Sequence, residues 1–274
     1  LNGEQAQKAI SAVFPKIKMQ GHASFAVEPT TIDIASLNDN FNALQLKMTA
    51  QTKQLTLSLE NFGFKNHNLT LTLDVNNGES RLQSKQTIER LSIPEGSVEN
   101  ISLSTSSAFT LKDIAQAIKT NDPPFQFNIQ TLLTAHQINI KPLKVKDFEL
   151  TNKTSIPLQY LLSKNPLSPL ESSTQVTLGN IAAPPLRIKT YQTALELRLW
   201  DKTLEKADVS IQGKLRPIYI ASQEPLWLSH LKFNLTAQKD KNTLTLSDFK
   251  YKIANLLKGS SSLKVTEILS STPQ

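Results

Sequence analysis

The chain has 274 residues, of which 39% are apolar and 19% are charged, so it can form a core and is not globally disordered. Lysine and arginine outnumber aspartate and glutamate by 30 to 23, giving a net charge of +7. Only five of the basic residues are arginines, and the lysines are spread singly along the sequence. Because arginine is preferred for bidentate phosphate and base contacts, no nucleic-acid partner is expected.

The sequence offers little chemistry for catalysis. It contains no cysteine, which excludes disulfides, zinc–thiolate sites and thiol nucleophiles. Its four histidines lie far apart, no serine occupies a nucleophile elbow, and no glycine-rich phosphate loop is present. Aspartates that could form a glycosidase pair have polar or basic neighbours and are interpreted as cap or turn residues. We therefore expect no enzymatic activity, no catalytic or metal-binding residues and no cofactor.

The first predicted element is an amphipathic helix over 4–14, with apolar residues at three- and four-residue spacing. Asn2 would cap this helix and Pro15 would end it. The chain begins at Leu1, and no stretch approaches the roughly 18–20 apolar residues of a membrane span. We therefore expect that the chain is a fragment of a longer protein, with a signal or membrane anchor in the flanking sequence.

Most of the remaining sequence alternates between apolar and polar residues, which predicts antiparallel strands with one apolar and one polar face. The alternation is clearest over 44–48, 55–59, 69–75, 125–129, 138–150, 195–199, 209–211, 231–235 and 244–253. The fold class is therefore predicted to be mainly β. Repeated antiparallel hairpins would form an elongated curled sheet or a sandwich, with two or three short helices.

Two of these short helices are predicted between the strands. One covers 111–119, with Thr110 as its N-cap, and the other covers 156–164. Ser155 would cap the second of these helices, and Pro157 would lie in its first turn.

An internal repeat is the most informative feature of the sequence. Residues 44–65 and 231–252 both show an alternating strand, Thr-Ala-Gln with a polar turn, Leu-Thr-Leu-Ser, and an acidic or amide residue before Phe. Residues 125–150 carry a looser copy. A chance likeness between simple Leu/Thr strands is the alternative explanation, but the Thr-Ala-Gln and Phe anchors at matching offsets favour a repeat.

Prolines suggest a division of the chain. Five of them fall between residues 155 and 185, where the alternation also weakens, although Val176 and Leu178 indicate one strand. The predicted organisation is a helix with repeated hairpins over 1–154, a Pro-rich connection or cap over 155–185, and a second hairpin region over 186–274.

The repeated strand pairs resemble those of the AsmA/TamB-like group of bacterial envelope proteins. The resemblance rests on the form "alternating strand, polar turn, Leu-Thr-Leu, Asp/Asn-Phe", as in FNLTAQKDKNTLTLSDFKY, and covers about 12–110 and 185–255. It implies a periplasmic segment with a long curled sheet, whose apolar groove conducts or shields phospholipid acyl chains between two membranes. Phospholipid or another lipid would be the main partner, with envelope proteins as a second class.

The residues expected to line this groove are the apolar positions of the two repeat copies. They are Leu44, Leu46, Met48, Leu55, Leu57, Leu59, Leu231, Phe233, Leu235, Leu244 and Leu246. The same aliphatic face could instead pack the closed core of a β-sandwich, which would act as an adhesion or scaffolding module that binds another protein. Period-two alternation does not distinguish an open groove from a closed core.

Overall fold

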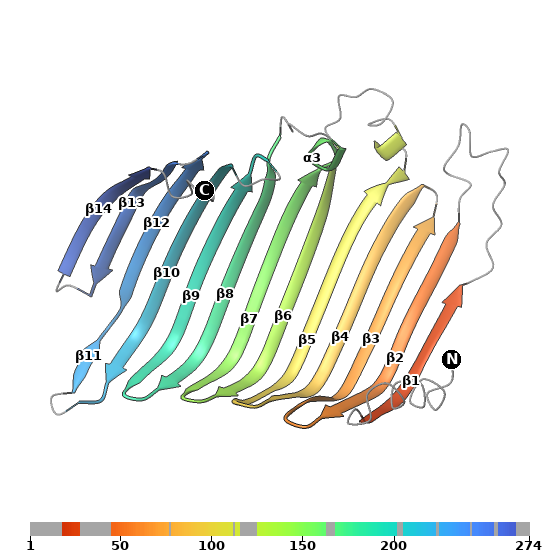
Figure 1. Ribbon diagram of the computed structural model, residues 1–274, viewed down its shortest axis with the longest axis horizontal. Helices are drawn as coiled ribbons and strands as arrows, with labels where there is room; N and C mark the ends of the chain where they lie inside the picture. Colours follow the sequence, from red (N-terminus) through yellow and green to blue (C-terminus); the bar gives the residue numbers. More distant parts are fainter. Residues whose placement is uncertain are drawn as a thin grey trace, which may run out of the picture.

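A computed structural model of the protein shows one large antiparallel β-sheet (Figure 1). The description covers residues 18–27, 45–76, 78–111, 113–115, 125–162, 168–201, 205–222, 225–241, 243–254 and 257–266. Strands that follow one another in sequence are also neighbours in the sheet, with the short β11 beside β10 and off the main path. The fold is therefore a single meander, and the predicted mainly β class with antiparallel hairpins is confirmed.

The strands are long, mostly 14 or 15 residues, which corresponds to roughly 50 Å of extended chain. Their bounds are β1 Lys18–Val27, β2 Leu46–Leu59, β3 Phe62–Asn76, β4 Glu79–Ile93, β5 Gly96–Thr110, β6 Gln126–Ile140, β7 Leu143–Pro157, β8 Leu170–Ala183, β9 Leu186–Leu199, β10 Lys206–Ile220, β11 Leu226–Leu228, β12 Leu231–Asp240, β13 Thr243–Ile253 and β14 Leu257–Thr266.

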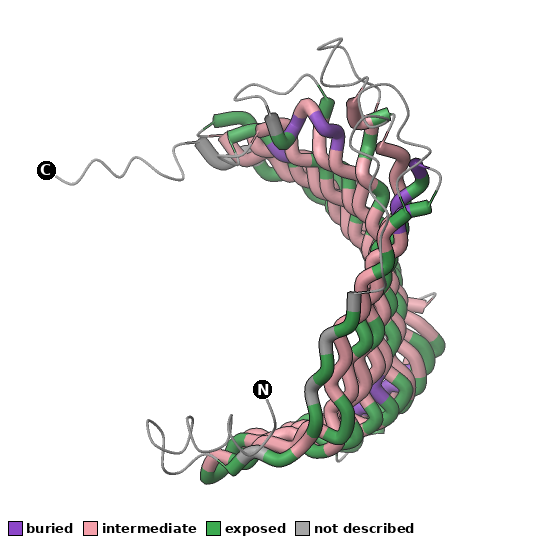
Figure 2. Tube along the Cα trace, turned by 90° about the vertical axis from the view of Figure 1, so that its right-hand side faces the viewer, coloured by how far each residue is buried: buried purple, intermediate pink, exposed green. Residues whose placement is uncertain are grey.

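The sheet is open at both ends. β1 and β14 each pair with one neighbour only, and the described strands all belong to this one sheet. Of the two arrangements expected from the sequence, the described part of the chain therefore forms a single layer rather than a two-sheet sandwich. Viewed along its long axis, the sheet follows a C, because each strand bends along its own length (Figure 2).

The bend coincides with residues that have left-handed backbone inside strands. Gln54, Asn66, Asn100, Asp147 and Asn180 have φ between 49° and 56°, and each lies four to six residues from a tight turn along the same edge (Figure 1). Such residues interrupt the pleat and bend a strand, as β-bulges do. Register shifts in β2–β3 and β7–β8 occur at these positions.

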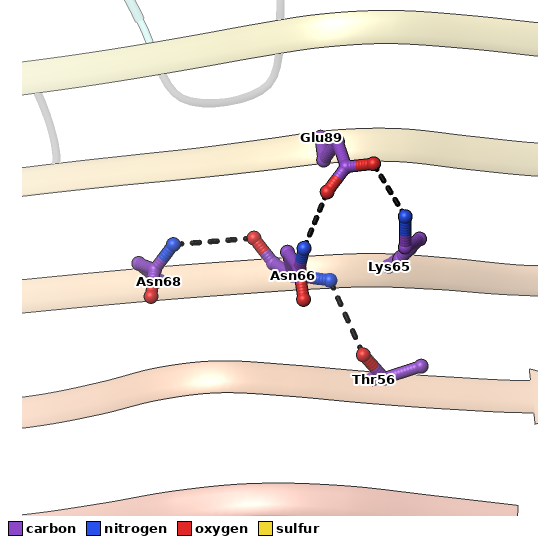
Figure 3. Close-up of polar contacts among 5 residues, drawn as sticks. All are labelled: Thr56, Lys65, Asn66, Asn68 and Glu89. Atoms are coloured by element: carbon purple, nitrogen blue, oxygen red, sulfur yellow. Dashed lines mark hydrogen bonds and ion pairs between the residues drawn. The ribbon is translucent and has the colours of Figure 1, made fainter.

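Polar side chains hold the bend in β2–β4 (Figure 3). The backbone N–H of Asn66 donates to Thr56 Oγ1 at 3.2 Å, and its side-chain amide donates to Glu89. Lys65 Nζ also donates to Glu89, at 2.6 Å. These two hydrogen bonds, Lys65 first, lower the pKa of Glu89. The bend is thus built from interactions that use both the backbone and the side chain of Asn66.

Helical residues are described at two of the positions where short helices were predicted. Thr110 caps a helical turn as predicted, since its Oγ1 accepts from the N–H of Asp113 at 3.1 Å. The prediction for 156–164 was wrong at its start: β7 continues to Pro157, and α3 covers only Leu158–Leu162. Ser155 is not a cap, because its hydroxyl donates to Gln126 on β6 at 2.7 Å. The predicted helix over 4–14 lies outside the described residues.

The two copies of the predicted repeat do not adopt the same structure. The C-terminal copy is a hairpin of the paired strands β12 and β13. In the N-terminal copy, the segment predicted as a polar turn lies inside β2, and Gln54 bends the strand without reversing it. The looser copy over 125–150 is a hairpin of β6 and β7. The unit that recurs is therefore the long hairpin, whereas the sequence motif is used in two ways.

The Pro-rich segment contains a complete strand. β8 pairs with β7 on one side and with β9 on the other, so the sheet continues through the region predicted as a connection or cap. Val176 and Leu178 lie in this strand, as their alternation indicates. Pro184 and Pro185 form the tight turn between β8 and β9, where neither residue needs to donate a ladder hydrogen bond.

Candidate functional site

Register assigns the side chains of the sheet to two faces. Residues directly opposite each other on antiparallel neighbours lie on the same face, and positions two apart along a strand share it. One face, here called the apolar face, carries most of the leucine, isoleucine, valine and phenylalanine residues. The other, the polar face, carries most of the lysine, arginine, glutamine and threonine residues.

A continuous row of apolar side chains crosses nine consecutive strands near the tight turns. We call it the apolar band. Its residues, one from each of β2–β10, are Leu57, Phe64, Leu91, Val98, Ile138, Val145, Ile181, Ile188 and Ile218. At about 4.8 Å between strands, the band is roughly 38 Å long. It runs across the strands, and therefore along the axis of the C seen in Figure 2.

The band contains a cluster of buried apolar residues, formed by Val145, Ile181, Ile188 and Ile218. Val145 is 2% exposed, Ile218 5% and Ile188 6%. Leu178, Tyr191, Leu215 and Leu231 pack against this cluster from beyond the bend. Apolar residues on both sides of the bend therefore share one face. This holds although Leu215 and Ile218 in β10 are three positions apart, a spacing that would place them on opposite faces of a regular strand.

Elsewhere on the apolar face, large side chains remain accessible to solvent. Leu71 and Leu82 are 39% and 40% exposed, and Leu257 and Leu263 on β14 are 53% and 55% exposed. Leu263 lies opposite Leu246, which places it among the residues predicted for the groove. Large apolar side chains that remain exposed on one face of a protein can mark a binding site.

A polar cluster interrupts the apolar face in the central strands. Asn152 Nδ2 donates to Thr174 Oγ1 and to Ser172 Oγ, both at 2.8 Å, and Asn152 Oδ1 accepts from Thr154 at 2.8 Å. The cluster satisfies its own hydrogen bonds within the sheet. The apolar face is thus continuous along the band, but it is divided farther from the tight turns.

The described residues predicted for the groove share this face at two separate places. Leu46, Met48, Leu55, Leu57 and Leu59 lie on β2, whereas Leu231, Phe233 and Leu235 lie on β12 and Leu244 and Leu246 on β13. Nine strand steps separate β2 from β12, or about 43 Å. These residues therefore form two ends of one face and do not meet in one pocket. Leu44 lies outside the described residues.

Sequence reasoning missed the central part of the face. Ile138, Val145, Ile181, Ile188 and Ile218 form the best-packed stretch of the band, but the repeat directed attention to its ends. A signal for them was present. In β5–β10 two consecutive non-aliphatic residues separate a band residue from the next apolar or small residue, as Glu99 and Asn100 separate Val98 from Ile101.

Other kinds of site find little support in the described part of the chain. It holds no group of three or more histidine, aspartate and glutamate side chains that could bind a metal ion. Its helical segments are too short or too polar to cross a membrane. Trp227 is 68% exposed and packs against Tyr219, with 4.4 Å between the two ring centroids.

No family model, curated protein or solved structure matches the chain.

Proposed function

We propose that this protein holds phospholipid acyl chains against the apolar face of its sheet and shields them from water. The proposed setting is the periplasm, with lipid moving between the two bacterial membranes, as the resemblance to the AsmA/TamB-like group implies. The proposed role is non-catalytic. The observation that carries it is an apolar band across nine strands of a sheet that remains a single open layer in the described residues.

The dimensions of the band suit an extended hydrocarbon ligand. The band is roughly 38 Å long and lies parallel to the axis of the C, so that acyl chains could lie beside it, against the exposed apolar side chains of the same face. Each methylene removed from water contributes about 0.8 kcal/mol. The partly exposed apolar residues supply contacts to a ligand without any rearrangement of the sheet.

A photocrosslinking experiment tests this proposal. Leu143 and Leu132 lie on the paired strands β7 and β6 and are 36% and 40% exposed, but on opposite faces. Leu143 is adjacent to the band, and Leu132 is on the polar face. A photoreactive amino acid at 143 should crosslink a labelled phospholipid, and the same amino acid at 132 should not.

Native mass spectrometry of the purified chain, followed by organic extraction, gives an independent measurement. Co-purifying phospholipid that survives washing is the expected result. A clean apo mass, together with no uptake of added fluorescent phospholipid, would rule out lipid carriage by this chain. Equal crosslinking at 132 and 143 would show that lipid contact is nonspecific.

A protein partner is the second candidate, and the open edges of the sheet favour it. β1 and β14 each leave one row of backbone donors and acceptors without a strand partner in the described residues. An extended segment of another protein could add to such an edge as a further strand. This scaffolding role would be favoured by two results together: a native mass without bound lipid, and binding of a defined extended peptide to the edge of β14.

A further inference from the structure

The polar face carries an unusual row of like charges at its C-terminal end. Lys214 lies directly opposite Lys232, Lys232 opposite Lys252, and Lys252 opposite Lys258. These four residues, here called the lysine ladder, come from the four successive strands β10, β12, β13 and β14. At about 4.8 Å per strand, they span roughly 14 Å.

The ladder has no acidic partners among the described residues. None of its four lysines forms an ion pair there, whereas the neighbouring Lys250 is paired with Asp248 at 3.0 Å. Elsewhere in the sheet, Lys65 is paired with Glu89 at 2.6 Å. Like charges directly opposite each other destabilise a sheet. The ladder therefore costs stability that a closely bound anion would restore.

The electrostatic effect of the ladder is visible at its neighbours. Desolvation first, and then the charges of Lys232, Lys252, Lys214 and Arg216, lower the pKa of His230. Desolvation, Arg216 and Lys232 likewise lower the pKa of Lys214. Positive charge is thus concentrated at this place and is not merely part of a dispersed basic surface.

The ladder also borders a groove. A cavity of about 970 Å³ is lined by all four lysines, with Lys250 and the polar side chains of Gln192, Gln212 and Asn234. Register places these side chains on the polar face in two rows, one containing Lys214 and the other Gln212. The row between them, which includes Gly213 and Phe233, belongs to the opposite face. The groove thus offers several ammonium groups together with amide donors.

We propose that the lysine ladder docks this end of the sheet onto anionic phospholipid head groups at a membrane surface. Charge complementarity carries the assignment: four ammonium groups in one line, with no ion pair among the described residues, match the phosphates of a planar anionic surface. Lysine ammonium groups also suit a diffuse surface charge, whereas arginine is the usual choice for bidentate recognition. This site lies on the face opposite the apolar band, so it does not depend on acyl-chain binding.

Vesicle co-sedimentation of the full chain tests the proposal. The ladder variant carries Lys214→Gln, Lys232→Gln, Lys252→Gln and Lys258→Gln. The control variant carries Lys85→Gln, Lys144→Gln, Lys153→Gln and Lys189→Gln, which are exposed lysines from β4, β7 and β9. Both variants lose four positive charges. Circular dichroism and thermal melting confirm that each variant retains the sheet.

Wild type and the control variant should bind vesicles made from equal parts of phosphatidylcholine and phosphatidylglycerol, and added salt should weaken that binding. The ladder variant should bind them on the order of a hundredfold more weakly. None of the three should bind phosphatidylcholine alone.

Equal losses in the two variants would overturn the proposal, because net charge alone would then explain the binding. Failure of the wild-type protein to bind the anionic vesicles would also overturn the proposal. Tighter binding of single-stranded DNA than of anionic vesicles, at the same salt and with the same dependence on the ladder, would instead assign the ladder to nucleic acid.

Discussion

Five non-glycine residues inside the described strands have left-handed backbone, and four of them are asparagine or aspartate. These side chains tolerate this region of φ better than other non-glycine residues, because they can hydrogen-bond to nearby backbone groups. The bend of the sheet therefore depends on single residues at fixed distances from the tight turns. Their replacement should reveal the cost of the backbone conformation separately from the cost of lost side-chain contacts.

Asn66 allows this separation. Asn66→Gly and Asn66→Ala both remove the amide that donates to Glu89, but only alanine has a side chain that disfavours a φ of 53°. The alanine variant should therefore be less stable than the glycine variant by about 1 kcal/mol. Urea denaturation measures the difference. Equal stabilities would show that the backbone at this position relaxes on substitution.

Glu89 should make the stability of the bend depend on pH. Its pKa in the folded protein lies below the usual glutamate value of 4.5, because Lys65 and Asn66 donate hydrogen bonds to its carboxylate. Its contribution is therefore fully present above about pH 4.5 and is lost as the pH falls through the folded-state pKa. Glu89→Gln should lower the melting temperature at pH 7 but not at a pH below the folded-state value.

Glu149 provides the matched control for this measurement. It is an exposed residue of β7 outside the ion pairs described above. Glu149→Gln should shift the melting temperature less than Glu89→Gln at pH 7. A Glu89→Gln shift that is the same at both pH values would contradict the assigned role of the carboxylate.

At the scale of strands and hairpins, the sequence predicts more of the fold than of the site. Alternation identifies strand positions well because one face is apolar and the other polar, and Val176 and Leu178 indicate β8 even within the Pro-rich segment. The connection of these strands is less predictable. The same Thr-Ala-Gln motif lies inside β2 and in the second half of β12. A residue with left-handed backbone follows both copies, and such a residue can either bend a strand or reverse it.

The distances between the predicted groove residues could not be predicted from the sequence for the same reason, namely that the connection of the strands was unknown. Leu57 and Leu231 do share a face, but their distance from each other depends on the number of strands between them. Period-two alternation carries no information on that number. The lysine ladder could not be predicted either, because its four members are far apart in sequence and meet only through the register of β10–β14.

Cross-strand packing of an aromatic residue over a glycine joins β10 to β12. A Cβ added at Gly213 would clash with the ring of Phe233, its direct partner. Gly213→Ala should therefore lower the free energy of unfolding by about 1 kcal/mol, since the ring must move. In a Phe233→Leu background the cost should disappear. Chemical denaturation of the double-mutant cycle measures this coupling, and additive effects would contradict it.

At the scale of the whole molecule, stability should vary across the sheet. Inner strands pair on both sides, whereas β1 and β14 pair on one side only. Because strands can be lost from an end without disturbing the centre, opening should cost least at the edges. Backbone amides of β14 should thus exchange with deuterium faster than those of β6 and β7. Uniform exchange across all strands would show instead that the sheet opens as one cooperative unit.

The order of the strands has a further consequence for how the chain reaches this structure. Each strand on the main path of the sheet pairs with the previous strand on that path, so no pairing waits for a distant part of the chain. Loop closure is therefore inexpensive at every step, in contrast to sheets with long crossovers. The protein can assemble progressively from its N-terminal strands, with each new strand pairing to the edge of the sheet already formed. A hairpin inserted into or deleted from the middle would leave every other pairing intact, which makes the length of such a sheet easy to change.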